Sequence, residues 1–150
     1  MAELTDNEIE DLVFREYAPS PDIDLIQVPE PERSFIAIYC AQGIIDNGGL
    51  RYFFENDFPT KEAYTIIMQS YRNIGFPELA EAIEKVFMLF PNSVPHPNLH
   101  KRSGFLNEYF DEFSDKYHPT VKWTEDMLFK QSGKVYSNVV ALYRRAEGRQ

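Results

Sequence analysis

The apolar residues of this 150-residue chain recur three and four positions apart in most of its segments, which is the spacing of one face of an α-helix. No segment shows the sustained alternation of apolar and polar residues that is typical of a β-strand. The sequence therefore predicts an all-α fold, which we expect to be a single-domain bundle of about seven or eight helices.

Capping and breaking residues place the expected helices along the chain. A capping box at residues 5–8 predicts the start of the first helix, and four prolines within residues 18–31 predict an extended linker after it. Residues 33–45 are apolar nearly all round, which is typical of a central, buried helix. Further helices are expected over residues 50–56, from a cap at Thr60 to Gly75, over 77–90 and 105–117, and over 123–129 and 135–143 as one rod interrupted near Ser132 and Gly133.

The formal net charge of −9 lies entirely within the first 32 residues. These hold ten acids and one base, whereas residues 33–150 hold equal numbers of acids and bases. We therefore expect residues 1–31 to form an acidic N-terminal helix with a proline-rich linker, followed by a helical domain over residues 32–150. An acidic surface repels the phosphate backbone of nucleic acids and attracts basic proteins, so the expected partner is a basic protein.

Two groups of carboxylates are the candidate partner-binding residues. On the helix expected over residues 105–117, four carboxylates recur at one-turn spacing and would form a single stripe roughly 10 Å long. These four are Glu108, Asp111, Glu112 and Asp115. The N-terminal group consists of Glu8, Asp11, Asp22 and Asp24. A docking surface for a cationic partner is one interpretation of the stripe, and an ordinary solvated helix face is the other.

Sequence motifs of catalysis and cofactor binding are missing, so we expect no enzymatic activity, no cofactor and no metal. There is no nucleophile elbow, phosphate-binding glycine loop or dinucleotide fingerprint. Cys40 lies in the most apolar expected helix, where a cysteine acts as a small hydrophobe. His96 and His100 have the spacing of metal ligands, but the prolines beside His96 argue against a helix there. The single cysteine, with no signal peptide and no membrane-spanning segment, predicts a cytoplasmic protein without membrane contacts.

Aromatic residues make up 15% of the chain, including twelve Phe and nine Tyr. One interpretation is that they fill the core of a small helical domain, because each ring buries a large apolar area. The alternative is a small-ligand-binding protein or an enzyme with an aromatic-lined pocket. The residues expected to line that pocket are Tyr39, Tyr52, Tyr64 and Tyr71.

Residues 44–56, IIDNGGLRYFFEN, combine a turn sequence with aromatic residues and a final asparagine. We interpret six of these residues as a structural motif: Asn47, Gly48, Gly49, Phe53, Phe54 and Asn56. The asparagine and the glycines tolerate the backbone conformations of a turn, and the phenylalanines are expected to pack into the core. The segment resembles the signature of the bacterial DNA-mimic protein family, and the resemblance extends over residues 33–145.

This resemblance implies an all-helical fold, commonly dimeric, in which an acidic face takes the place of DNA. The implied partner is a DNA-binding regulator, such as a helix-turn-helix protein, and a homodimer would double the acidic charge presented to it. An immunity-type inhibitor of a basic toxin is a further alternative, because it too needs only an acidic face.

Overall fold

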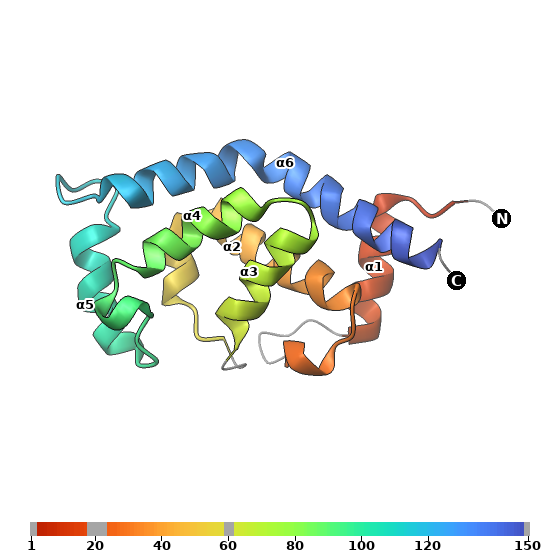
Figure 1. The fold of residues 1–150 in the computed structure, drawn as a ribbon, viewed down its shortest axis with the longest axis horizontal. Coiled ribbons are helices and arrows are strands. Elements are labelled where there is room, and N and C mark those ends of the chain that lie inside the picture. Colours follow the sequence, from red (N-terminus) through yellow and green to blue (C-terminus); the bar gives the residue numbers. More distant parts are fainter. Residues whose placement is uncertain (1–2, 18–23, 59–61, 149–150) are drawn as a thin grey trace.

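The computed structural model describes residues 3–17, 24–58 and 62–148 (Figure 1). Within these ranges it contains six α-helices, two short 3₁₀ helices and no strand. The α-helices are α1 (Asp6–Tyr17), α2 (Glu32–Glu55), α3 (Ala63–Asn73), α4 (Pro77–Phe87), α5 (Leu99–Tyr109) and α6 (Pro119–Glu147), and the 3₁₀ helices are η1 (Leu25–Gln27) and η2 (Pro91–Ser93). The predicted all-α fold is confirmed, whereas the predicted count of seven or eight helices is too high.

Of the two predicted helix breaks, the first is a kink within α2 and the second is absent. Residues 50–55 continue α2, although φ of 72° and ψ of −170° at Gly49 interrupt its helical geometry and kink it. Ser132 and Gly133 lie inside α6 without interrupting it. A glycine in a helix interior costs about 1 kcal/mol, and burial of Leu128 and Val135 on either side of this one outweighs that cost.

The helix expected over residues 105–117 is wrong at both ends. α5 starts earlier, after Asn98, whose side chain accepts a hydrogen bond from the His100 N–H at 2.8 Å and caps the helix. It ends at Tyr109, and turns follow as far as residue 118. The Asp111 carboxylate accepts the Phe113 N–H at 3.0 Å, a local bond that competes with helical hydrogen bonding. The carboxylates of Glu108, Asp111, Glu112 and Asp115 therefore do not form a stripe on one helix.

α2 lies at the centre of the bundle and contacts α1, α3, α5 and α6. The apolar segment that was expected to be buried is indeed buried, with Phe35 and Ile38 fully inaccessible. Beyond the kink, Phe54 lies 5.0 to 5.9 Å between ring centroids from four other aromatic side chains, those of Tyr64, Phe87, Phe90 and Phe110. Much of the aromatic content of the chain therefore fills the core.

α6 runs along the whole molecule, from beside α5 to beside α1 (Figure 1). His118 caps its start by accepting the Thr120 N–H at 3.1 Å, and its 29 residues make it about 43 Å long. None of the helices in the described ranges combines the length and the apolar character that crossing a membrane requires. The length of α6 keeps the α5 end and the α1 end of the molecule well apart.

A buried glutamine joins three helices. The Gln42 amide donates to the Asp46 carboxylate at 2.9 Å and to the Leu128 carbonyl of α6 at 3.2 Å. Its carbonyl oxygen accepts the Tyr71 hydroxyl of α3 at 2.8 Å. Gln42 therefore fastens α2 to both of its main neighbours.

The described part of the predicted linker lies against the body. Leu25 and Val28 are buried, and the Arg33 guanidinium donates to their carbonyl oxygens at 3.0 and 2.8 Å. Thr60, the expected cap of α3, lies outside the described residues. The division of the chain at residue 31 stays a prediction.

Candidate functional site

The predicted capping box is present at the start of α1, and the burial of two residues shows which face of this helix packs against the core. The Glu8 carboxylate accepts the Thr5 N–H at 2.7 Å, and the Thr5 hydroxyl accepts the Glu8 N–H at 3.2 Å. Ile9 and Val13 are each 1% exposed and bury the apolar stripe of α1 in the common core. The acids of α1 are therefore left on its other faces.

The predicted N-terminal partner-binding residues within the described ranges are all exposed. Glu8 and Asp11 lie on α1, and Asp24 precedes η1, where it accepts the Ile26 N–H at 3.2 Å. Asp22 lies outside the described residues. Although Glu8 and Asp24 cap helices, their side chains are exposed and belong to the acidic surface.

The end of α6 neutralises part of this charge. Arg144 forms ion pairs with Asp6 at 2.7 Å and with Glu3 at 3.5 Å. Four further acids of α1 form no ion pair with any described residue: Glu8, Glu10, Asp11 and Glu16.

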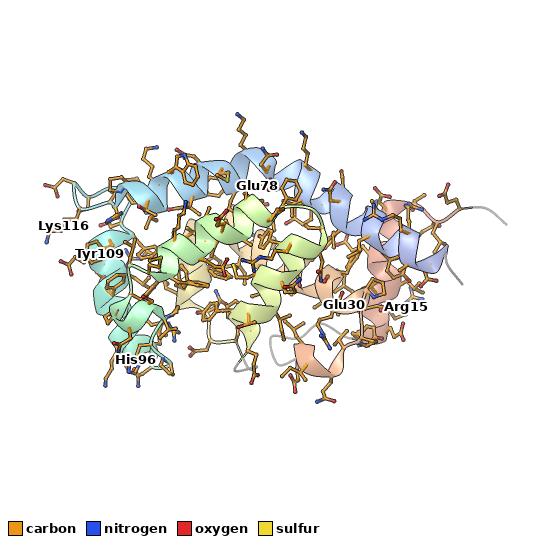
Figure 2. All side chains as sticks on the ribbon, viewed as in Figure 1. Arg15, Glu30, Glu78, His96, Tyr109 and Lys116 are labelled. Atoms are coloured by element: carbon orange, nitrogen blue, oxygen red, sulfur yellow. The ribbon has the colours of Figure 1, made fainter. Side chains whose placement is uncertain are left out.

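Acids from other parts of the chain join α1 at this end of the molecule. Burial raises the pKa of the Glu32 carboxyl at the start of α2, and the nearby charges of Glu16, Glu147 and Glu30 raise it further. Sequence reasoning missed Glu147, because only the fold brings the end of α6 to α1. We call the whole group the N-terminal acidic end: Glu3, Asp6, Glu8, Glu10, Asp11, Glu16, Glu30, Glu32 and Glu147 (Figure 2 labels Glu30 and, on α1, Arg15).

At the other end of the molecule, a pocket of about 330 Å³ lies where α2 is interrupted. Beside the Asn47-Gly48-Gly49 backbone, its lining consists of four carboxylates (Asp46, Asp111, Glu112 and Glu125), three phenylalanines (Phe110, Phe113 and Phe129) and Arg51. We call it the kink pocket. Of the predicted acidic stripe, Asp111 and Glu112 belong to this lining, whereas Glu108 on α5 and Asp115 in the following turns do not.

Glu125 is the buried carboxylate of the kink pocket, with an exposure of 7%. It accepts a hydrogen bond from the Tyr117 hydroxyl at 2.5 Å. Burial raises the pKa of the Glu125 carboxyl, the hydrogen bond from Tyr117 lowers it, and the charges of Glu112 and Asp126 raise it. Sequence reasoning missed Glu125, because its local sequence resembles that of any exposed helical acid.

Glu125 also explains why a glycine is required at the kink. A Cβ atom on Gly49 would lie 2.2 Å from the Glu125 carboxylate, so the buried Glu125 side chain would have to move. The φ of Gly49 is positive as well, in a region that residues with a Cβ rarely adopt. The kink and the buried carboxylate therefore fit each other.

The other motif residues act within α2 and the core. The Asn47 and Asn56 side chains each donate to the carbonyl oxygen four residues earlier, both at 2.7 Å. Phe53 and Phe54 are fully buried. These residues shape the helix and offer little surface to a partner.

A family model for DMP19-like proteins matches residues 26–142. The chain belongs to the DMP19-like protein family. The match covers more than three quarters of the chain, including all the residues that line the kink pocket, while α1 lies outside it. The DNA-mimic family that the sequence resembles is confirmed as the family, and the short Asn-Gly-Gly signature stays a prediction. Comparisons with curated proteins and with solved structures find no match.

In this DMP19-like chain, the surroundings of Cys40, His96 and His118 are typical of structural residues and not of a catalytic or metal site. Burial raises the pKa of the Cys40 thiol, which disfavours the reactive thiolate. His96 accepts the Asn98 N–H at 2.9 Å, and His118 caps α6. Within the described ranges, no three His, Cys, Asp or Glu side chains are grouped as a metal site would require.

The four tyrosines expected to line one pocket in this DMP19-like protein lie apart. Tyr64 lines an apolar cavity of about 590 Å³ between α3, α4 and the loop before α5. Tyr71 is buried against Gln42, Tyr39 stacks on the Phe35 ring, and Tyr52 is 46% exposed.

Proposed function

We propose that this DMP19-like protein is a non-enzymatic, cytoplasmic binding protein whose acidic surface occupies the DNA-binding surface of a basic protein. The partner class that we propose is a helix-turn-helix regulator. The observation that carries this proposal is the arrangement of α1, which buries an apolar stripe in the core and leaves four of its five carboxylates exposed. Membership of the DMP19-like family supports the same role.

The charge density of α1 is somewhat below that of one strand of DNA. The helix holds five acids and one base, Arg15, along its 12 residues. At 1.5 Å per residue it is about 18 Å long, which gives roughly one net negative charge per 4.5 Å. A single DNA strand carries about one charge per 3.4 Å, so α1 approaches the charge density of one strand. The neighbouring carboxylates of Glu30, Glu32 and Glu147 extend this surface.

The distance between the two ends of the molecule also suits such a partner. Along α6, Glu125 of the kink pocket and Glu147 of the N-terminal acidic end are 22 residues apart, which is about 33 Å. The two recognition helices of a dimeric helix-turn-helix protein lie roughly 34 Å apart on DNA. We propose that one chain, or a homodimer of it, presents acids to both recognition helices.

A competition experiment tests the proposal. The full chain is immobilised and used to capture proteins from a lysate at low salt, with and without excess duplex DNA. We expect a DNA-binding protein that the duplex displaces, and an affinity that falls at least about tenfold as salt rises from 50 to 200 mM. The paired substitutions Glu8→Gln and Asp11→Asn should weaken capture, while a matched control with the same charge change, Glu62→Gln and Glu81→Gln, should not.

Other outcomes favour other functions. Binding that ignores salt, or partners that duplex DNA does not displace, would contradict DNA mimicry. A captured basic toxin without a DNA-binding surface would instead support an immunity-type inhibitor. A co-purifying small molecule found by mass spectrometry would support the alternative of a ligand-binding protein, with the cavity beside Tyr64 as its site.

A further inference from the structure

The rim of the kink pocket exposes aromatic rings. Phe113 is 92% exposed, more than any other large apolar side chain in the described ranges, and Phe129 on α6 is 45% exposed. Both line the pocket. Apolar rings gathered at the mouth of a cavity are typical of a surface that a partner covers.

Hydrogen bonds hold two of the four carboxylates of the pocket in place. Asp46 accepts hydrogen bonds from the Gln42 amide at 2.9 Å and from the Ser132 hydroxyl at 2.6 Å. Glu125 accepts a hydrogen bond from the Tyr117 hydroxyl. Because these two carboxylates are fixed before binding, filling the pocket costs them little conformational entropy.

The charge of the pocket is negative and largely uncompensated. Arg51 is the one cation of its lining, and its guanidinium is engaged by Glu55 at 3.0 Å and by the side chain of Asn107. The other four charged residues of the lining are carboxylates. The pocket therefore complements a cation that also carries a flat apolar face.

We infer that the kink pocket binds the side chain of an arginine of the basic protein partner. A guanidinium stacks on aromatic rings and forms paired hydrogen bonds with a carboxylate, whereas a lysine ammonium is a compact, strongly hydrated charge. In this arrangement Phe113 or Phe129 lies against the guanidinium plane, and Glu112 accepts its hydrogen bonds. The inference rests on the proposed function for the nature of the partner, but the pocket can be tested without that partner.

The test uses N-acetyl-arginine amide as the probe and the full ¹⁵N-labelled chain as the receptor, observed by NMR. We expect saturable shifts of the Gly48, Gly49 and Phe113 amide signals, with the α1 signals unchanged. N-acetyl-citrulline amide has nearly the same shape without the charge and should cause no saturable shift.

Phe113→Ala should raise the Kd about two- to fivefold, because an exposed cation–π contact is lost. Glu112→Gln should raise it as well, while Glu81→Gln, a matched loss of an exposed carboxylate on α4, should not.

Several results would overturn the inference. These are equal shifts with the citrulline probe, saturation at α1 in place of the pocket, or an unchanged Kd in Phe113→Ala. The outcome is independent of the capture experiment. If the pocket binds the arginine probe but no partner is displaced by DNA, this inference is upheld and DNA mimicry is contradicted. If DNA displaces a captured partner but the pocket does not bind the arginine probe, only this inference is overturned.

Discussion

Gly49 and Glu125 meet from distant parts of the chain, one at the kink of α2 and the other on the first turns of α6. The Glu125 carboxylate occupies the position that a Cβ at residue 49 would take. The backbone there, with φ of 72° and ψ of −170°, is accessible almost only to glycine. A residue with a side chain at position 49 would therefore strain the backbone and would also displace the buried Glu125 carboxylate.

We expect Gly49→Ala to lower the free energy of unfolding by at least about 2 kcal/mol, because both effects act against it. Gly133→Ala is the matched control. The added methyl group at residue 133 meets no atom within 4 Å, and removal of a helical glycine should raise the free energy of unfolding by up to about 1 kcal/mol. Urea unfolding followed by circular dichroism measures both. A Gly49→Ala variant as stable as the parent would show that the kink is not constrained.

Glu125 makes the stability depend on pH. Because burial raises the pKa of its carboxyl above the ordinary 4.5, the folded protein takes up this proton at a higher pH than the unfolded chain does. The contribution to stability is therefore gained as pH falls through the raised pKa and lost as pH rises above it. In Glu125→Gln the position does not titrate. We expect the free energy of unfolding of the parent, relative to that of Glu125→Gln, to be larger at about pH 5 than at about pH 7.

Urea unfolding of both proteins at the two pH values measures this difference. A difference that stays constant, or that grows toward pH 7, would contradict the assignment. The same comparison for Glu81→Gln, an exposed carboxylate on α4 that is not among the charges acting on Glu125, serves as the control.

At the scale of the helices, Gln42 provides the polar link between α2, α3 and α6. We expect Tyr71→Phe to lower the free energy of unfolding by about 1 to 2 kcal/mol, because the buried Gln42 carbonyl loses its hydrogen-bond donor. Tyr52→Phe, which removes a hydroxyl from a side chain that is 46% exposed, should change it by less than about 0.5 kcal/mol. Thermal or urea unfolding of the two variants checks the comparison. Equal effects would mean that the buried hydroxyl contributes nothing of its own.

Local sequence predicts the helices well where a cap and an apolar stripe agree. The capping box of α1 and the proline in the first turn of α4 are both where the sequence indicates them. The errors occur where distant packing decides. Gly133 does not interrupt α6, because buried residues continue on both sides of it. α5 ends early because Asp111 bonds to its own backbone, an alternative that helical spacing does not reveal.

At the scale of the molecule, α1 belongs to the common core. Ile9, Val13, Leu25 and Val28 are all buried with residues of α2 and α6. We expect deletion of residues 1–31 to lower the free energy of unfolding by several kcal/mol, since each of these side chains contributes about 1.5 to 3 kcal/mol when buried. Urea unfolding of the truncated chain measures the loss. An unchanged stability would instead support a separate N-terminal unit with its boundary at residue 31.

Some features of the candidate site can be predicted from the sequence, and others arise only when the chain folds. The net charge and its location in the first 32 residues can be read from the sequence, and the exposed positions of Glu8 and Asp11 agree with it. The recruitment of Glu147 and the partial neutralisation by Arg144 depend on where α6 ends. The kink pocket depends on three segments that meet only in the folded chain. Contacts between residues far apart in the chain leave no pattern in the local sequence that could predict them.

A helix that extends from one end of a molecule to the other leaves no room for a change in its length. One residue inserted in the middle of α6 would move everything after it by about 1.5 Å and turn it by about 100°. Arg144 would then face away from Asp6, and Tyr143 would leave the core. The exposed loop over residues 91–98 would absorb the same insertion with little effect. Over evolutionary time, relatives of this chain should therefore gain and lose residues in such loops while α6 keeps its length.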